Sequence, residues 1–198
     1  MRCCTLLGPA LVIGLASLAG LPTQARPVPA ADAYSIDPVH SSVAFRIKHM
    51  NLAPFYGQFN DISGTVKLDA ADPTKSEMEV SIKVDAVDSH NEKRDAHLKS
   101  PDFFNAKNFP TMTFKSKSFA KSGDHAFDVS GDLTIHGVTK PITVKLEKTG
   151  EGKSPMGGQA IGFGTEFTIK RSDFGMSGML DALGDEVRVM IGLEAGKK

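Results

Sequence analysis

Cysteine is almost absent from this 198-residue chain, and its two copies, Cys3 and Cys4, lie side by side near the first residue. Residues 1–25 also carry a single charge at Arg2, an apolar run and small residues around Ala25, which predicts a cleavable export signal. Its removal would leave a chain without cysteine. Disulfides, thiolate chemistry and Cys-ligated metals are then excluded, and the exported protein must rely on its apolar core.

Long apolar runs and an excess of one charge are lacking as well. The run from Leu6 to Leu21 is about 16 residues long and contains glycine and proline, which is short of the roughly 20 residues that span a bilayer. Once residues 1–25 are removed, 22 basic and 23 acidic residues remain. We therefore expect no nucleic-acid partner and no stable membrane insertion. The rest, about 170 residues, is the size of one domain.

What the chain does contain is alternation of apolar and polar residues. Val43, Phe45 and Ile47 alternate with Ala44, Arg46 and Lys48, which puts one face of a strand in an apolar interior and the other in water. The same period of two recurs around seven further positions: Val66, Met78, Met112, Val129, Val144, Phe163 and Val189. Eight strands are predicted.

Turn residues separate these strands. His136-Gly137 fits a tight hairpin, and a shift of apolar parity between Phe59 and Ile62 predicts a bulge or bend near Asn60-Asp61, helped by Gly64. Eight one-sided antiparallel strands would leave two costly edges unless the sheet closes on itself. We predict an all-β fold, an eight-stranded antiparallel β-barrel. A two-sheet sandwich is the alternative, which periodicity does not separate from the barrel.

One segment, about residues 89–109, has a helical pattern instead. Ser89 with Glu92 has the spacing of a capping box, and Pro101 predicts that the helix ends at about Lys99. A short turn then carries Phe103 and Phe104, and we expect these rings to lie on the end or flank of the barrel.

The predicted interior carries no charged residue. An eight-stranded barrel is just wide enough to be filled by its own side chains or to hold one small apolar ligand, and alternation produces the same pattern in both cases. Gly64 and Gly131 on the inward face, together with the insert as a mouth or lid, favour a cavity. The residues that we predict to line it are Phe45, Ile47, His49, Phe59, Val80, Ile82, Phe103, Phe104, Phe114, Phe127, Val129, Phe163, Phe167 and Val189.

Seven stretches of the chain carry a resemblance to a known family. They are His40 to His49, Gly57 to Phe59, Asn91 to Phe104, Phe109 to Phe114, Gly131 to Pro141, and Ser172 to Met176 followed by Gly184 to Val187. In this order, over about residues 34–195, the chain resembles the YceI-like family, and as a set the motifs are highly specific.

The resemblance implies a lipocalin-like periplasmic β-barrel that holds a polyisoprenoid or similar long-chain lipid in its interior, as a carrier or storage protein. It implies a bound lipid rather than a cofactor. We expect the predicted lining residues to contact this lipid, and we expect the protein to be a monomer or homodimer. Residues 26–33 would be a linker before the barrel domain. The alternative is an envelope-stress or partner-binding barrel with a packed core and no ligand.

A few polar residues could carry chemistry. His49 shares inward parity, so it could bond a lipid head group or tie the strand end to the insert. His90 and His97 would lie two helical turns apart, about 10 Å, too far to share one metal ion. Arg94 with Asp95 and Arg171 with Asp173 fit surface or capping pairs. There is no nucleophile elbow, zinc-protease motif or phosphate-binding glycine loop, so we expect neither catalysis nor a metal site.

Overall fold

The computed structural model describes Met1, residues 31–154 and residues 157–198. The expected export signal and most of the expected linker lie outside these residues, and the last two residues of that linker belong to the first strand. The strands are β1 (Asp32–Ile36), β2 (Ser42–His49), β3 (Ala53–Phe59), β4 (Ile62–Leu68), β5 (Glu77–Lys83), β6 (Val87–Asp88), β7 (Thr111–Lys121), β8 (Ala126–Ile135), β9 (Val138–Lys153), β10 (Gln159–Lys170) and β11 (Leu183–Lys197). The helices are α1 (Glu92–Lys99) and three 3₁₀ turns, Pro73–Lys75, Val84–Ala86 and Arg171–Phe174.

These segments form a closed antiparallel barrel. β11 pairs with β1 at its C-terminal end and with β2 along the rest of its length, while β4 pairs with β1 and β3 with β2. On the next strand of the barrel, β5 pairs with β4 and β6 pairs with β3. Counted as continuous paths through the described residues, the segments make eight strands with no free edge, which confirms the predicted barrel over the sandwich.

The bends predicted from turn chemistry are present. β3 ends at Phe59 and β4 begins at Ile62, so the second strand bends at residues 60–61. A Cβ at Gly64 would collide with the backbone carbonyl of Glu79, so glycine is needed there for close approach of β4 and β5. Ile135 pairs with Val138 across His136 and Gly137, both with positive φ (52° and 74°), as a two-residue hairpin of this kind requires.

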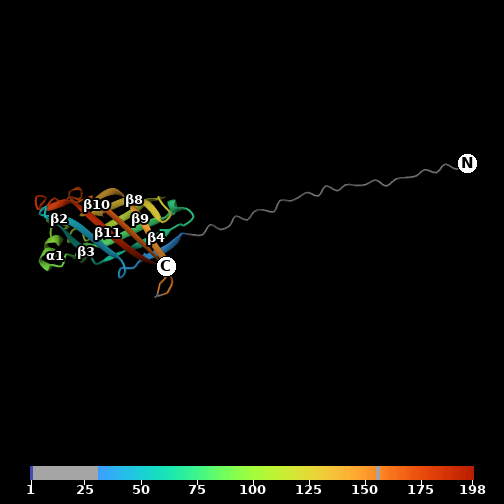
Figure 1. The fold of residues 1–198 in the computed structure, drawn as a ribbon, viewed down its shortest axis with the longest axis horizontal. Helices are drawn as coiled ribbons and strands as arrows, with labels where there is room; N and C mark the ends of the chain where they lie inside the picture. The colour runs from blue at the N-terminus through green and yellow to red at the C-terminus, as the bar shows by residue number, and fades with distance from the viewer. Residues whose placement is uncertain (2–30, 155–156) are drawn as a thin grey trace.

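The two ends of the barrel differ. α1, the end of β2 and the loop between β10 and β11 lie together at one end, and the C terminus lies toward the other (Figure 1). Near the C-terminal end of β11 the interior is filled: the side chains of Val66, Phe119, Ile161, Phe163 and Ala195 are 0–2% exposed. This half of the barrel has a conventional packed core.

The insert differs from its prediction at its first turn. α1 begins at Glu92, and its N-cap is Asn91, whose side chain accepts a hydrogen bond from the Arg94 N–H (3.0 Å). Ser89 was predicted as the cap, but it is buried and donates its backbone N–H and hydroxyl to Asp95. The helix ends at Lys99 as predicted. Of the described helices, none has the length and apolar character needed to cross a membrane.

Candidate functional site

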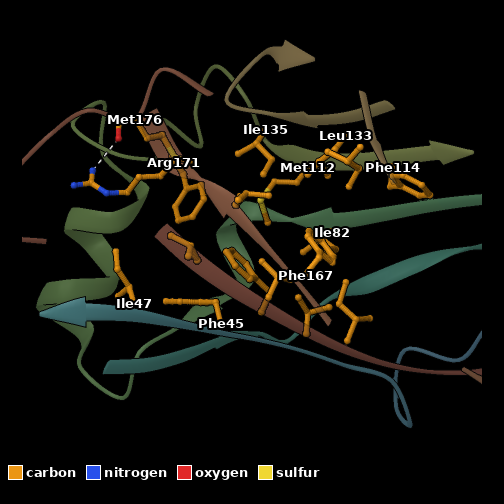
Figure 2. Close-up of a pocket in the computed structure, with 18 of the residues that line it drawn as sticks. Phe45, Ile47, Ile82, Met112, Phe114, Leu133, Ile135, Phe167, Arg171 and Met176 are labelled. Atoms are coloured by element: carbon orange, nitrogen blue, oxygen red, sulfur yellow. Dashed lines mark hydrogen bonds between the residues drawn. The ribbon is translucent and has the colours of Figure 1, made fainter. Parts of the chain in front are cut away.

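The half of the barrel nearest α1 is hollow. A cavity of about 370 Å³ lies inside it, within the roughly 300–1,000 Å³ typical of small-molecule pockets. Side chains from β2, β5, β7, β8 and β10 point toward this common space, as Figure 2 shows for Phe45, Ile82, Phe114, Ile135 and Phe167. Because inward positions of the strands are apolar, the wall offers contact area and almost no hydrogen bonds.

Twelve of the fourteen residues predicted to line the interior border this cavity: Phe45, Ile47, His49, Phe59, Val80, Ile82, Phe103, Phe104, Phe114, Val129, Phe167 and Val189. The two phenylalanines of the insert close one side, where the ring of Phe104 meets that of Phe59 edge to face (centroids 5.5 Å apart). The contact of these residues with a ligand stays a prediction.

Phe127 and Phe163 do not border the cavity, so their placement there was wrong. Phe163 is 2% exposed within the packed half of the barrel, and Phe127 packs against Phe119 with ring centroids 6.3 Å apart. Alternation identifies the face on which a side chain lies but not its height along the barrel axis. Phe127 and Phe163 lie at a different height along the barrel axis from the cavity.

The glycines that favoured a cavity do not create it. A Cβ at Gly131 would collide with the ring of Phe114, and a Cβ at Gly64 would meet Ile36. The space beside each glycine is therefore occupied by a neighbouring side chain. The hollow is instead bordered by half-buried side chains such as Ile82, Phe114 and Phe167.

The loop between β10 and β11 and the first residue of β11 supply lining residues that the sequence analysis missed, namely Arg171, Met176, Met179 and Leu183. Arg171 is buried and donates hydrogen bonds to four backbone carbonyls, those of Met176 (2.8 Å), Gly178 (2.7 Å), Leu183 (3.1 Å) and Gly184 (2.9 Å). Burial lowers its pKa from the ordinary value, and nearby Asp185 opposes that change. The guanidinium is thus a clamp that holds one wall of the cavity.

The acidic partner of this loop is Asp185 rather than the predicted Asp173. Asp185 accepts hydrogen bonds from the backbone N–H (2.9 Å) and hydroxyl (2.8 Å) of Ser172. Both bonds lower the pKa of Asp185, and the bond from the backbone N–H has the larger effect. The Arg171 clamp leaves only a weak signal in the sequence, a basic residue followed by a Gly-rich segment, because its acceptors are backbone carbonyls, which every residue has.

Besides Arg171, three polar side chains lie at the α1 end of the cavity: His49, Arg94 and His97. Arg94 stacks over Phe55, 4.3 Å from the ring centroid, and donates to the hydroxyl of Ser89 (2.8 Å). His97 bonds Asp102 (3.1 Å). His90 lies outside α1 with φ 59°, so the prediction that it lies two helical turns from His97 was wrong.

His49 differs from its neighbours because its side chain has no hydrogen-bond partner in the described part of the chain. It is exposed and borders the cavity from the end of β2. Deeper inside, the hydroxyl of Thr165 is buried and also unpaired among the described residues. The exposed side chains of His49, Arg94 and His97 border the cavity at its α1 end, which we call the mouth. The site can therefore surround an apolar molecule and offer it a few polar contacts, chiefly at this mouth.

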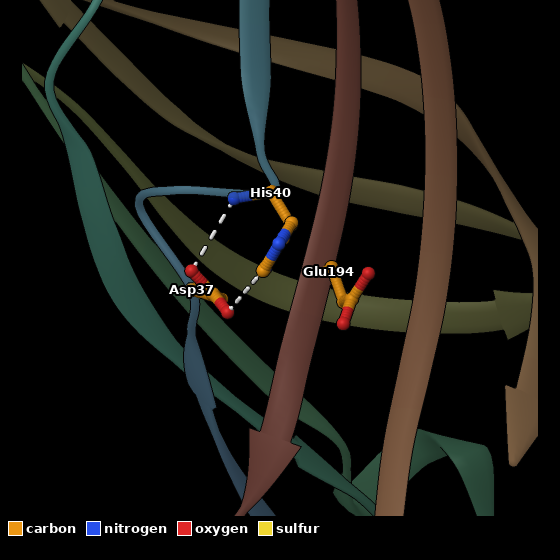
Figure 3. A group of neighbouring side chains, drawn as sticks. All are labelled: Asp37, His40 and Glu194. Carbon is orange, nitrogen blue, oxygen red and sulfur yellow. Dashed lines mark hydrogen bonds and ion pairs between the residues drawn. The ribbon is translucent and has the colours of Figure 1, made fainter. Parts of the chain in front are cut away.

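A separate group of possible metal ligands lies where the turn between β1 and β2 meets β11. Asp37, His40 and Glu194 place their ligand atoms within 4.8 Å of one another (Figure 3). The carboxylate of Asp37 accepts from the Val39 N–H (2.8 Å) and bonds the His40 ring (2.8 Å). The latter bond lowers the pKa of Asp37 and raises that of His40. The two side chains therefore brace the bend between the strands.

Fold and cavity together define a closed antiparallel barrel with an apolar chamber that opens at one end. The chain belongs to the YceI-like family, since the YceI-like domain model matches residues 34–195. It is 40% identical over 185 residues to protein YceI of Escherichia coli O157:H7. The aligned residues cover 92% of this chain and 95% of that protein.

The solved structures that match the fold include two from other bacteria. BcnA of Burkholderia cenocepacia matches with a TM-score of 0.73 and 27% identity, over 80% of this chain and 98% of BcnA. A polyisoprenoid binding domain from Saccharophagus degradans matches with a TM-score of 0.67 and 18% identity, over 84% of this chain and 99% of that one.

Proposed function

We propose that this chain is an exported periplasmic binding protein, which holds a polyisoprenoid or similar long-chain lipid in its barrel as a carrier or storage protein. The observation that carries the proposal is the apolar chamber of about 370 Å³, whose strand walls present aliphatic and aromatic side chains. The name of the Saccharophagus degradans domain supports the choice of lipid. Membership of the YceI-like family supports it too.

The energetics favour an apolar chain over a polar ligand. Each Å² of apolar surface removed from water contributes about 25 cal/mol, less the cost of ordering the ligand. A polar ligand would instead lose hydrogen bonds to water that strand residues such as Val80, Ile82 and Phe167 cannot replace. Binding of this kind requires neither a cofactor nor a catalytic step, and we propose none.

A barrel with a packed core, which was the alternative, fits only the half around Phe119 and Phe163. The half nearest α1 retains its hollow. A protein that worked only through its outer surface would have no use for that hollow, and larger side chains would stabilise it. We therefore propose the cavity, rather than the outer face, as the functional site.

The test is native mass spectrometry of the protein purified from its own cell envelope, with solvent extraction and identification of the lipid. Val189→Trp places a larger apolar ring inside the chamber, next to Phe45 on β2 and Phe167 on β10. We expect stoichiometric lipid on the wild type and about tenfold less on this variant, because the added ring occupies the space that the lipid needs.

Arg188→Trp is the matched control. Arg188 is the adjacent residue on β11, forms an ion pair with Glu166 and points outward, so the same ring added there should leave bound lipid unchanged. Wild-type protein that is free of lipid, and that stays so after incubation with envelope lipids, would contradict the proposal.

A further inference from the structure

Exposed apolar side chains gather around the mouth of the cavity. Four of the seven large hydrophobic residues that are exposed in the described chain lie there: Met50 (52%), Leu52 (85%), Met179 (52%) and Leu180 (44%). We call these four the apolar rim. Met50 and Leu52 are on the β2–β3 hairpin, and Met179 and Leu180 are on the loop before β11.

The two loop tips form one surface. The backbone N–H of Met50 donates to the carbonyl of Ala182 (2.6 Å), and His49 pairs with Leu183 where β2 meets β11. Met50 and Met179 have positive φ values of 51° and 54°. Glycine or asparagine is the usual residue in such a conformation, so local turn preference does not account for an exposed methionine at either place.

The apolar rim is continuous with the chamber. Met179 belongs to both, and His49 and Leu183, which flank the rim, also border the cavity. Exposed residues of both signs, Lys48 and Asp181, lie beside it. Charges of opposite sign thus adjoin the rim in the chain, and its four side chains themselves offer apolar contact.

We propose that the apolar rim docks the mouth of the barrel onto a lipid bilayer, so that the cargo passes between membrane and chamber without entering water. This inference rests on the proposed function. A long-chain lipid that crossed water would expose its apolar surface at about 25 cal/mol per Å². Four side chains inserted at the interface give weak, reversible attachment, which suits a protein that must leave again.

The experiment measures uptake of a polyprenol by the protein without its export signal. The donor vesicles are made of phosphatidylethanolamine and phosphatidylglycerol and carry the polyprenol. After rapid removal of the vesicles, lipid bound to the protein is counted over time. The variant is Leu52→Ser with Leu180→Ser, two rim residues that do not border the cavity. We expect its uptake rate to fall about tenfold, with little dependence on salt.

Val39→Ser is the matched control, since Val39 is 80% exposed but lies between β1 and β2, away from the mouth. It should take up lipid at the wild-type rate. Equal uptake rates for the rim variant and the wild type would overturn docking. A wild-type dimer that the rim substitutions dissociate would also overturn it, because a second copy of this chain would then cover the rim.

Equilibrium binding of the same polyprenol from detergent micelles separates the two proposals. The wild type and the rim variant should bind equally there, because their chambers are identical. If the wild type binds nothing from micelles, the proposed lipid-binding function fails. If both bind equally from micelles and at equal rates from vesicles, docking alone fails.

Discussion

Glycine faces an aromatic ring at several places in the barrel wall. A Cβ at Gly57 would overlap the far end of the Phe45 ring, and a Cβ at Gly131 would overlap the Phe114 ring and the backbone carbonyl of Lys115. Both rings border the cavity. The glycines thus leave room for these two rings in the barrel wall.

Substitution at Gly57 should therefore change binding more than folding. In Gly57→Ala the new methyl group displaces the Phe45 ring toward the chamber, and we expect lipid affinity to fall about tenfold. The free energy of unfolding should change by no more than about 1 kcal/mol, since alanine also restricts the unfolded chain. Lipid titration and urea denaturation measure the two quantities.

Gly164→Ala provides the comparison for this prediction. Its Cβ would lie 3.5 Å from the nearest atom, a methyl carbon of Thr149, which is ordinary van der Waals contact. Lipid affinity should then equal that of the wild type. A loss of affinity as large as that of Gly57→Ala would show that the position of the Phe45 ring is not the cause.

Polar contacts hold the loop between β10 and β11 in its shape. Arg171 holds it from inside through four carbonyls, and Asp185 holds its first turn through Ser172. The loop carries part of the chamber wall and half of the apolar rim. Its anchoring therefore connects the ionisation of one carboxyl group to the mouth of the cavity.

Acid should weaken this anchor. The bonds from Ser172 favour the carboxylate of Asp185 and hold its pKa below the ordinary 3.8 in the folded protein. The stabilisation is therefore complete above the ordinary pKa, and it is lost as the pH falls through the lowered one. Asp185→Asn should cost about 1 kcal/mol at pH 7, and the difference from wild type should shrink in acid.

Urea denaturation of both proteins between pH 3 and pH 7 measures that difference directly. Other carboxyl groups titrate in both proteins, so subtraction removes their contribution. A difference that stays constant down to pH 3 would mean that the ionisation of Asp185 does not stabilise the loop.

At the scale of the whole molecule, the sequence determines the closed barrel well because its signal is repeated in every strand. Val43, Phe45 and Ile47 define one face of β2, and each other strand has an equivalent set, so closure follows from the cost of free edges. Depth along the axis leaves no such signal. Phe163 and Phe167 share a strand and a face, yet only Phe167 borders the cavity.

The clamp was unpredictable for a related reason. Arg171 acts on backbone carbonyls, and those become its partners only after the chain has folded around it. The N-cap shows the same competition at short range. Ser89 and Asn91 are both suitable N-cap residues. The hydroxyl of Ser89 instead forms hydrogen bonds with Asp95 and Arg94, which leaves Asn91 as the cap. Patterns that recur are read from sequence, whereas single contacts depend on the fold.

The contrast between a packed and a hollow half leads to a prediction for the whole barrel. Amide hydrogens of Val66, Phe119 and Phe163, in the packed half, should exchange only on global unfolding, because tight packing leaves no cheaper opening. Amides of α1 and of the loop before β11 should exchange much faster in the empty protein.

Lipid at a hundred times its Kd should slow exchange around the chamber by about a hundredfold, because opening then requires release of the ligand. Hydrogen–deuterium exchange read by mass spectrometry, with and without the polyprenol, measures both effects. Equal protection of the two halves in the empty protein would mean that the hollow costs the barrel no local stability. Slowing confined to the packed half would place the lipid elsewhere than in the chamber.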